Sequence, residues 1–320
     1  MLLDLLLFVF GLVLLILGAD GLVRGASALA KRLGVSELAV GLTVVAFGTS
    51  MPELVVNVFA SMNAHPEIVF GNIIGSNNFN LFVILGISGL ITPLAVQSTT
   101  VWREIPFSFL ATVLLFVLAN ETVLNPGARL VSRLEGGLLL LLFVLFLTYL
   151  SRRLKVRSPD NADPDAGWSG LKTAGFILSG LAGLVLGGKL AVDHAVSIAA
   201  RLGADEKLIG LTLVAAGTSL PELAASVAAA LRKHIDIAVG NVIGSNLFNI
   251  LLILPVSALI RPAPYDASFN TDLLLLVGGT LFLFTAMFTG QRKKLDRWEA
   301  GLLLFVFIGY MVVLIRLRTG

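Results

Sequence analysis

The segment Gly48-Thr49-Ser50-Met51-Pro52-Glu53-Leu54 returns, with one substitution, as Gly217-Thr218-Ser219-Leu220-Pro221-Glu222-Leu223. A second motif follows each copy, first as Gly71-Asn72-Ile73-Ile74-Gly75-Ser76-Asn77 and then as Gly240-Asn241-Val242-Ile243-Gly244-Ser245-Asn246. Each later copy lies 169 positions after the earlier one. Between 41–57 and 210–226, 11 of 17 residues are identical, and between 71–82 and 240–251, 8 of 12. The chain is therefore predicted to be a duplicated unit with one polar site in each copy.

The composition is that of a membrane protein. Of the 320 residues, 57% are hydrophobic and only 13% are charged, and the mean hydropathy is +0.94. Soluble domains carry about 25% charged residues. The net charge of +3 comes from Lys and Arg between apolar runs, which indicates membrane topology rather than nucleic-acid binding. The absence of cysteine excludes disulfides, thiol chemistry and cysteine-ligated metals.

The apolar runs predict an all-α membrane protein with ten transmembrane helices. A bilayer-spanning helix needs about 20 apolar residues. Residues 2–18 lack a basic leader and a cleavage site, so they are expected to remain as part of the first span. The first and sixth spans are long enough that both are expected to be strongly tilted. The predicted spans are 2–31, 37–62, 67–92, 104–120, 130–150, 170–200, 206–231, 237–260, 271–289 and 297–316.

Five spans in each half predict inverted repeats. The first repeat is 1–150, the second is 170–320, and 151–169 is a polar linker. Because five is odd, the second copy enters the membrane from the opposite side. With the N-terminus outside, the cytoplasmic segments hold 14 Lys and Arg residues and the external segments hold seven. The excess of positive charge inside favours external N- and C-termini and a cytoplasmic linker.

Gly48 to Pro52 predict a break inside the second span. Pro52 has no N–H to donate to the Gly48 carbonyl, and Gly48 is a poor helix former. The carbonyls from Ala46 to Gly48 are therefore expected to lack helical partners, and Pro221 predicts the same for carbonyls near Ala215. Such carbonyls are tolerated in a bilayer where they line a cavity. Broken helices at matching positions of two halves indicate the central site of a transporter.

Glu53 and Glu222 fall near the middle of their predicted spans. An unpaired charge there costs at least about 2.5–3.5 kcal/mol on insertion scales. The pattern Ser50-x-x-Glu53, with its counterpart Ser219-x-x-Glu222, also matches a helix capping box with an early proline. A serine could cap the helix alone without burying a charge. Cation binding is therefore the favoured interpretation, and capping can coexist with it.

The second motif offers neutral oxygens in the third and eighth spans. Gly75 and Gly244 permit a further break there, and the alternative is hydrogen bonding between tightly packed helices. Oxygen donors without His or Cys suit Na⁺, Ca²⁺ and Mg²⁺. Mg²⁺ tends to keep its waters, so a dehydrated cage favours Ca²⁺. The side chains concerned are Ser76, Asn77, Asn80, Ser245, Asn246 and Asn249.

The paired motifs resemble the α-repeats of the Ca²⁺:cation antiporter superfamily, in its prokaryotic sodium/calcium exchanger branch. The resemblance covers essentially the whole chain. It implies that Glu53 and Glu222 are central Ca²⁺ ligands shared with Na⁺, and that the Ala46 and Ala215 carbonyls contribute to flanking Na⁺ sites. Some members carry aspartate at the position of Asn249, and asparagine in both halves puts proton coupling or a potassium requirement in doubt. The further predicted ligands are Thr49, Ser50, Thr218, Ser219, Ser76, Ser245, Asn80 and Asn249.

The expected function is electrogenic exchange of Na⁺ for Ca²⁺ by alternating access, in a transporter and not an enzyme. Ca²⁺, Na⁺ and membrane lipid are the expected partners, with no cofactor, nucleic acid or obligate protein partner, and the prokaryotic plasma membrane is the expected location. H⁺/Ca²⁺ exchange, K⁺-dependent exchange and a cation channel remain as alternatives. An intramembrane hydrolase would need an aspartate dyad or a Ser–His pair. The three histidines, His65, His194 and His234, lie at predicted span ends or in loops.

Overall fold

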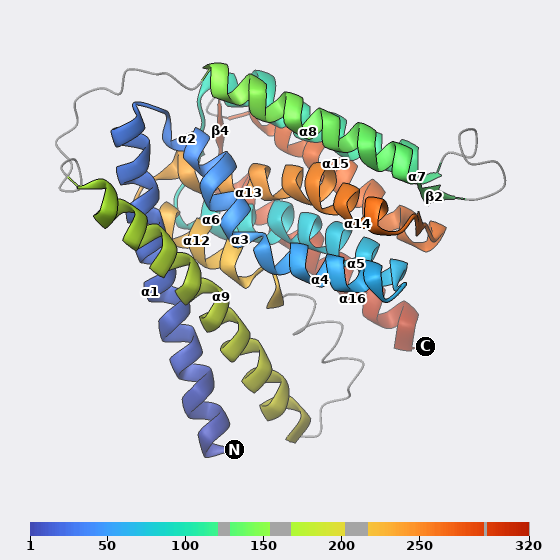
Figure 1. Ribbon diagram of the computed structural model, residues 1–320, viewed down its shortest axis with the longest axis horizontal. Coiled ribbons are helices and arrows are strands. Elements are labelled where there is room, and N and C mark those ends of the chain that lie inside the picture. Colours follow the sequence, from blue (N-terminus) through green and yellow to red (C-terminus); the bar gives the residue numbers. More distant parts are fainter. Residues whose placement is uncertain (121–128, 154–167, 202–216, 291–292, 320) are drawn as a thin grey trace.

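The computed structural model describes residues 1–120, 129–153, 168–201, 217–290 and 293–319, and most of them are helical (Figure 1). Within these residues the strands are four two-residue segments, β1 (Leu94–Ala95), β2 (Leu130–Val131), β3 (Ala263–Pro264) and β4 (Lys294–Leu295). The longer α-helices are α1 (Leu2–Leu33), α4 (Met51–Met62), α5 (Pro66–Asn78), α7 (Ile105–Asn120), α8 (Arg133–Arg153), α9 (Gly170–Arg201), α12 (Leu220–Leu231), α13 (Ile235–Phe248), α15 (Asn270–Ala286) and α16 (Arg297–Thr319). The shorter helical segments are α2 (Glu37–Val40), η1 (Gly41–Val45), α3 (Ala46–Thr49), η2 (Phe79–Ile84), α6 (Leu85–Ile91), η3 (Thr100–Glu104), η5 (Asn249–Ile253), α14 (Leu254–Ile260) and the 3₁₀ turn η6 (Ala267–Phe269).

Eight helical stretches of the described chain are long and apolar enough to cross a membrane, and a bent pair makes up to nine. Their positions agree closely with the predicted spans, and the two longest are α1 and α9, with 32 residues each. The expectation of a helical membrane protein is confirmed. Of the predicted span 206–231, only residues 217–231 are described.

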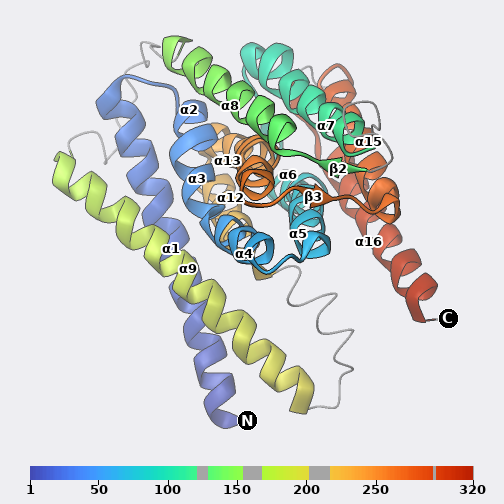
Figure 2. The ribbon, with the colours of Figure 1, turned by 45° about the vertical axis from the view of Figure 1, so that its right-hand side comes forward.

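The long helices α1 and α9 lie side by side along one flank of the bundle (Figures 1 and 2). Glycines at seven-residue intervals let the two backbones touch. A Cβ added to Gly18 would lie 2.7 Å from the Leu184 nitrogen, and one added to Gly187 would lie 2.5 Å from the Leu15 nitrogen. Gly11 meets Gly187 and Gly18 meets Gly180, so the pair is antiparallel. Small residues permit this close packing between apolar helices, for which lipid supplies no hydrophobic driving force.

The centre of the bundle is formed by the spans Pro66–Ile91 and Ile235–Ile260. In an 18-residue apolar stretch of each, 72% and 78% of the residues are buried, whereas this share is at most 39% in the other unbroken spanning helices of the described chain. Each central span packs on a helix from the other half of the chain: α6 packs on α16, and α14 packs on α8. Likewise β1 pairs with β4, and β3 pairs with β2, both antiparallel. Each half of the chain therefore completes the packing of the other.

The predicted break in the second span is confirmed. The helix from Glu37 to Met62 bends by 47° at Ser50, directly before the proline turn. The break expected at Gly75 and Gly244 is wrong, because both glycines lie inside continuous helices. Gly244 instead lets α13 approach the first half, since an added Cβ would lie 2.7 Å from the Ala46 Cβ. The irregularity comes a turn later, in the π-helical segments η2 and η5.

Gly187→Ala should destabilise the protein because the added methyl carbon overlaps the α1 backbone. Overpacking of this kind costs about 1–3 kcal/mol. Gly175→Ala on the same helix is the matched control, because nothing lies within 4 Å of its added Cβ. The control should be neutral or slightly more stable, since alanine favours helix by up to about 1 kcal/mol. Melting temperatures of the purified variants in detergent check this, and equal values would contradict the proposed backbone contact.

Candidate cation-binding site

The two proline turns bring the serine of each half to the glutamate of the other. Ser50 Oγ donates to Glu222 Oε1 at 2.9 Å, and Ser219 Oγ donates to Glu53 Oε1 at 3.2 Å. Neither serine makes a side-chain capping bond to its own helix, so the capping-box interpretation is wrong here. The reason is geometric, because each hydroxyl is turned across the interface instead. The four side chains therefore meet at one site rather than at two.

Both carboxylates are buried in the first turn of a helix. Glu53 on α4 and Glu222 on α12 are each 1% exposed. The positive end of the helix dipole favours a negative charge at this position. Yet Oε2 of each glutamate has no hydrogen-bond partner, and neither glutamate forms a salt bridge with a described residue. Two acidic oxygens thus remain available in the buried interior, where an uncompensated charge is costly.

The threonines of the first motif are held by asparagines that the sequence analysis did not assign. Thr49 Oγ1 donates to Asn241 Oδ1 at 3.1 Å, and Thr218 Oγ1 lies 3.3 Å from Asn72 Oδ1. These asparagines belong to the duplicated Gly-Asn motif, and its repetition is the sequence feature that could have indicated their role. Because each threonine proton is taken up by an amide oxygen, a lone pair of the hydroxyl stays free for another partner.

The backbone carbonyl of Ala46 is less free than the sequence predicted. It accepts a hydrogen bond from the Ser50 nitrogen at 3.0 Å, and Thr49 Oγ1 lies 3.3 Å away. The expectation that the proline leaves this carbonyl without a partner is therefore wrong. The carbonyl that loses its helical partner is that of Gly48, because Pro52 has no N–H. Ala215 lies outside the described residues.

The serines of the second motif are both buried but are bonded differently. Ser76 Oγ is 3.1 Å from Ser219 Oγ, which links it to the glutamate network. Ser245 is fully buried, and its hydroxyl has no partner. The two predicted serines, Ser76 and Ser245, therefore both lie in the interior, and only the Ser245 hydroxyl is without a hydrogen-bond partner.

Asn80 and Asn249 add two further oxygens. Each lies in a π-helical segment, η2 and η5, where the wider turn interrupts the regular spacing of side chains. Both residues are 1% exposed, and Oδ1 of each has no hydrogen-bond partner. The matching positions in the two halves therefore present matching unpaired amide oxygens.

The arrangement fits a hard cation bound as substrate. Five of the predicted residues carry a buried oxygen without a partner, namely Glu53, Glu222, Asn80, Asn249 and Ser245. Among the described residues, no three or more His, Cys, Asp or Glu side chains lie close enough together to hold a metal ion. Neutral oxygens must therefore complete any coordination shell around the two carboxylates. Carboxylate, amide and hydroxyl oxygens are the ligands that Ca²⁺ and Na⁺ accept. Two negative charges balance one Ca²⁺.

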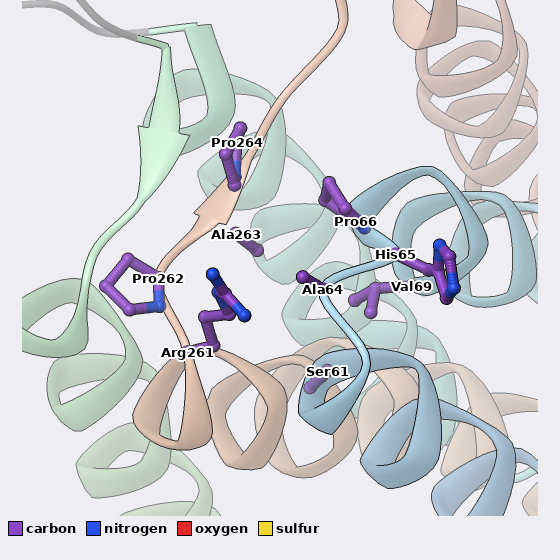
Figure 3. A pocket seen from close by; sticks show the side chains of 9 residues that line it. All are labelled: Ser61, Ala64, His65, Pro66, Val69, Arg261, Pro262, Ala263 and Pro264. Atoms are coloured by element: carbon purple, nitrogen blue, oxygen red, sulfur yellow. The ribbon is translucent and has the colours of Figure 1, made fainter.

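One cavity of the structure lies away from these residues. It measures about 250 Å³ and is lined by the turn between α4 and α5 and by the segment that follows α14 (Figure 3). Arg261 and His65 are its ionisable lining residues, and none of the predicted ligands lines it. A cationic lining disfavours a cation, so this cavity is not the predicted site.

Comparison with known proteins gives consistent matches over nearly the whole chain. Residues 3–152 and 172–316 match the family model described as sodium/calcium exchanger protein. The putative antiporter CaxA of Alkalimonas amylolytica is 38% identical, over 88% of this chain and 89% of its own. The sodium/calcium exchanger MaX1 of Methanosarcina acetivorans is 35% identical, over 88% of this chain and 90% of its own.

A solved structure matches the fold as well as the sequence. The sodium-calcium exchanger NCX_Mj, soaked with zero Na⁺ and Ca²⁺, superimposes with a TM-score of 0.84. It is 34% identical, and the match covers 98% of this chain and 99% of that one.

Proposed function

Because this chain belongs to the sodium/calcium exchanger protein family, we propose that it exchanges Na⁺ for Ca²⁺ across a membrane. The family predicted from the duplicated motifs is confirmed, and with it a cation/Ca²⁺ antiporter. The observation that carries the choice of cargo is the set of five buried oxygens without a partner among the predicted ligands, two of them carboxylate oxygens and three of them neutral. Such a set stabilises a dehydrated hard cation and offers no soft ligand.

The proposed ligands are the residues assigned from the sequence. Glu53 and Glu222 bind Ca²⁺ and Na⁺ alternately, because the same two charges can be balanced by one Ca²⁺ or by two Na⁺. The neutral oxygens around them can hold a further Na⁺, so the exchange is electrogenic. The Ala46 and Ala215 carbonyls stay predicted ligands of flanking Na⁺ sites. The other proposed ligands are Thr49, Ser50, Thr218, Ser219, Ser76, Ser245, Asn80 and Asn249.

The proposed architecture is ten helices in two inverted repeats, 1–150 and 170–320, that alternate access to one central site. Three observations support it. The first helices of the two halves, α1 and α9, pack antiparallel. The contacts of β1 with β4 are mirrored by those of β3 with β2. The serine–glutamate bonds are reciprocal. Broken helices around one midplane site suit occlusion better than a continuous pore, which disfavours the channel.

Purified protein in proteoliposomes should take up ⁴⁵Ca²⁺ when Na⁺ is loaded inside and absent outside. Since more positive charge leaves on Na⁺ than enters on Ca²⁺, an inside-positive potential should speed this uptake and an inside-negative one should slow it. Parallel vesicles with imposed H⁺ or K⁺ gradients serve as controls.

Uptake that follows the pH gradient and ignores Na⁺ would instead favour H⁺/Ca²⁺ exchange. Uptake that needs K⁺ together with Na⁺ would favour the K⁺-dependent mode. Downhill flux of Ca²⁺ without any counter-ion would favour a channel.

We further propose a prokaryotic plasma membrane location with both termini outside and the linker 151–169 inside. The chain lacks cysteine, so single cysteines can report each face. Ala64 and Lys233 occupy matching exposed turns with the same positive φ, of 61° and 64°. In intact cells, a membrane-impermeant maleimide should label Ala64→Cys, whereas Lys233→Cys should react only after permeabilisation. The reverse pattern would contradict the orientation, and labelling of both from outside would contradict the inverted repeat.

A further inference from the structure

Four buried asparagines form a frame of hydrogen bonds between the two central spans, which runs from Asn249 through Asn77 and Asn246 to Asn80. Asn77 and Asn80 come from α5 and η2, and Asn246 and Asn249 come from α13 and η5. All four are at most 5% exposed. Every bond of the frame crosses from one half of the chain to the other.

Two backbone carbonyls set the direction of the hydrogen bonds in the frame. Asn77 Nδ2 donates to the Asn246 carbonyl at 3.4 Å, and Asn246 Nδ2 donates to the Asn77 carbonyl at 3.3 Å. A backbone carbonyl can only accept a hydrogen bond. Each amide must therefore turn its NH₂ group toward that carbonyl, which directs its own Oδ1 the other way.

That oxygen fixes the orientation of the second amide. Asn249 Nδ2 donates to Asn77 Oδ1 at 2.8 Å, and Asn80 Nδ2 donates to Asn246 Oδ1 at 3.0 Å. The atoms left over are Oδ1 of Asn80 and Oδ1 of Asn249, both without a partner. If either of these amides turned over, two oxygens would face each other inside the frame. An N–H donor would then replace the oxygen that is left free, and an N–H cannot ligate a cation.

We propose that Asn77 and Asn246 are positioning residues, which hold the side-chain oxygens of Asn249 and Asn80 toward the transported cation. This inference rests on the proposed function, because it takes those two oxygens as cation ligands. The connection is crosswise, so Asn77 acts through Asn249 and Asn246 acts through Asn80.

The test is a set of double-mutant cycles on the KM for Ca²⁺ in Na⁺-driven uptake. Asn77→Leu should raise KM roughly tenfold, the effect of one misplaced hydrogen-bonding group, with a smaller change in maximal rate. In an Asn249→Ala background it should have no further effect, and in an Asn80→Ala background it should keep its full effect. Asn246→Leu should have no further effect in the Asn80→Ala background and should keep its full effect in the Asn249→Ala background. Coupling of this kind isolates a pairwise interaction from general loss of stability.

Asn78→Leu is the matched control. Asn78 is also buried, but its Nδ2 donates to the Asp272 carbonyl at 3.0 Å, outside the frame, and leucine stands at the matching position 247. The control should leave KM unchanged. Asn77→Ser and Asn246→Ser shorten the side chain without adding bulk and carry the same predictions. The test therefore does not depend on leucine being tolerated.

Two patterns of lost affinity would overturn the positioning role while the wild type still exchanges Na⁺ for Ca²⁺. One is an equal loss of affinity in both alanine backgrounds, and the other is an equal loss in Asn78→Leu. Unchanged KM in the Asn77 and Asn246 variants would overturn it as well. A wild-type protein that does not couple Ca²⁺ uptake to Na⁺ would instead overturn the proposed function.

Discussion

The constraint on which the rest of the structure depends is the burial of two carboxylates that no cationic side chain of the described residues balances. Glu53 and Glu222 are each 1% exposed, and each keeps one oxygen without a partner. An isolated ionised carboxylate in an apolar interior is expensive, and the cost falls only when a counter-charge is supplied. A mobile cation is the counter-charge that can enter and leave. In the proposed exchange, the feature that destabilises the empty site is also the source of the affinity for the cation.

The site is shared between the halves because each half lacks part of it. Ser50 reaches across to Glu222, Ser219 reaches across to Glu53, and the asparagine frame bonds only between halves. Such reciprocity needs the two halves to approach closely, and Gly244 permits the approach of α13 in the second half to α3 in the first. A relative movement of the halves would change both glutamate environments together. This is how a duplicated fold can link binding of the cation to a change of access.

Much of this could be predicted from the sequence, and the failures have physical causes. Apolar runs and the proline turn gave the spans and the bend at Ser50, because length and a missing N–H act locally. Hydrogen-bond partners could not be predicted in the same way. Ser50 matches a capping box by spacing, but its hydroxyl is taken by a glutamate 172 residues away. Gly75 and Gly244 looked like helix breakers, although Gly244 serves close packing and the irregular turns come later. The role of Asn72 and Asn241 in holding the threonines depends equally on contacts between halves.

The most direct test of the account is the equilibrium binding of Ca²⁺ to purified protein, with the wild type compared with Glu53→Gln and Glu222→Gln. Glutamine keeps the shape of the side chain and removes its charge. Glu104→Gln is the control, because Glu104 is also buried with an unpaired Oε2 but belongs to η3, outside the site. The account predicts one Na⁺-displaceable Ca²⁺ per chain for the wild type and the control. It also predicts an affinity lower by roughly a hundredfold or more in both site variants, since one of two facing charges is lost. Wild-type affinity in Glu53→Gln and Glu222→Gln, with both proteins folded, would contradict it.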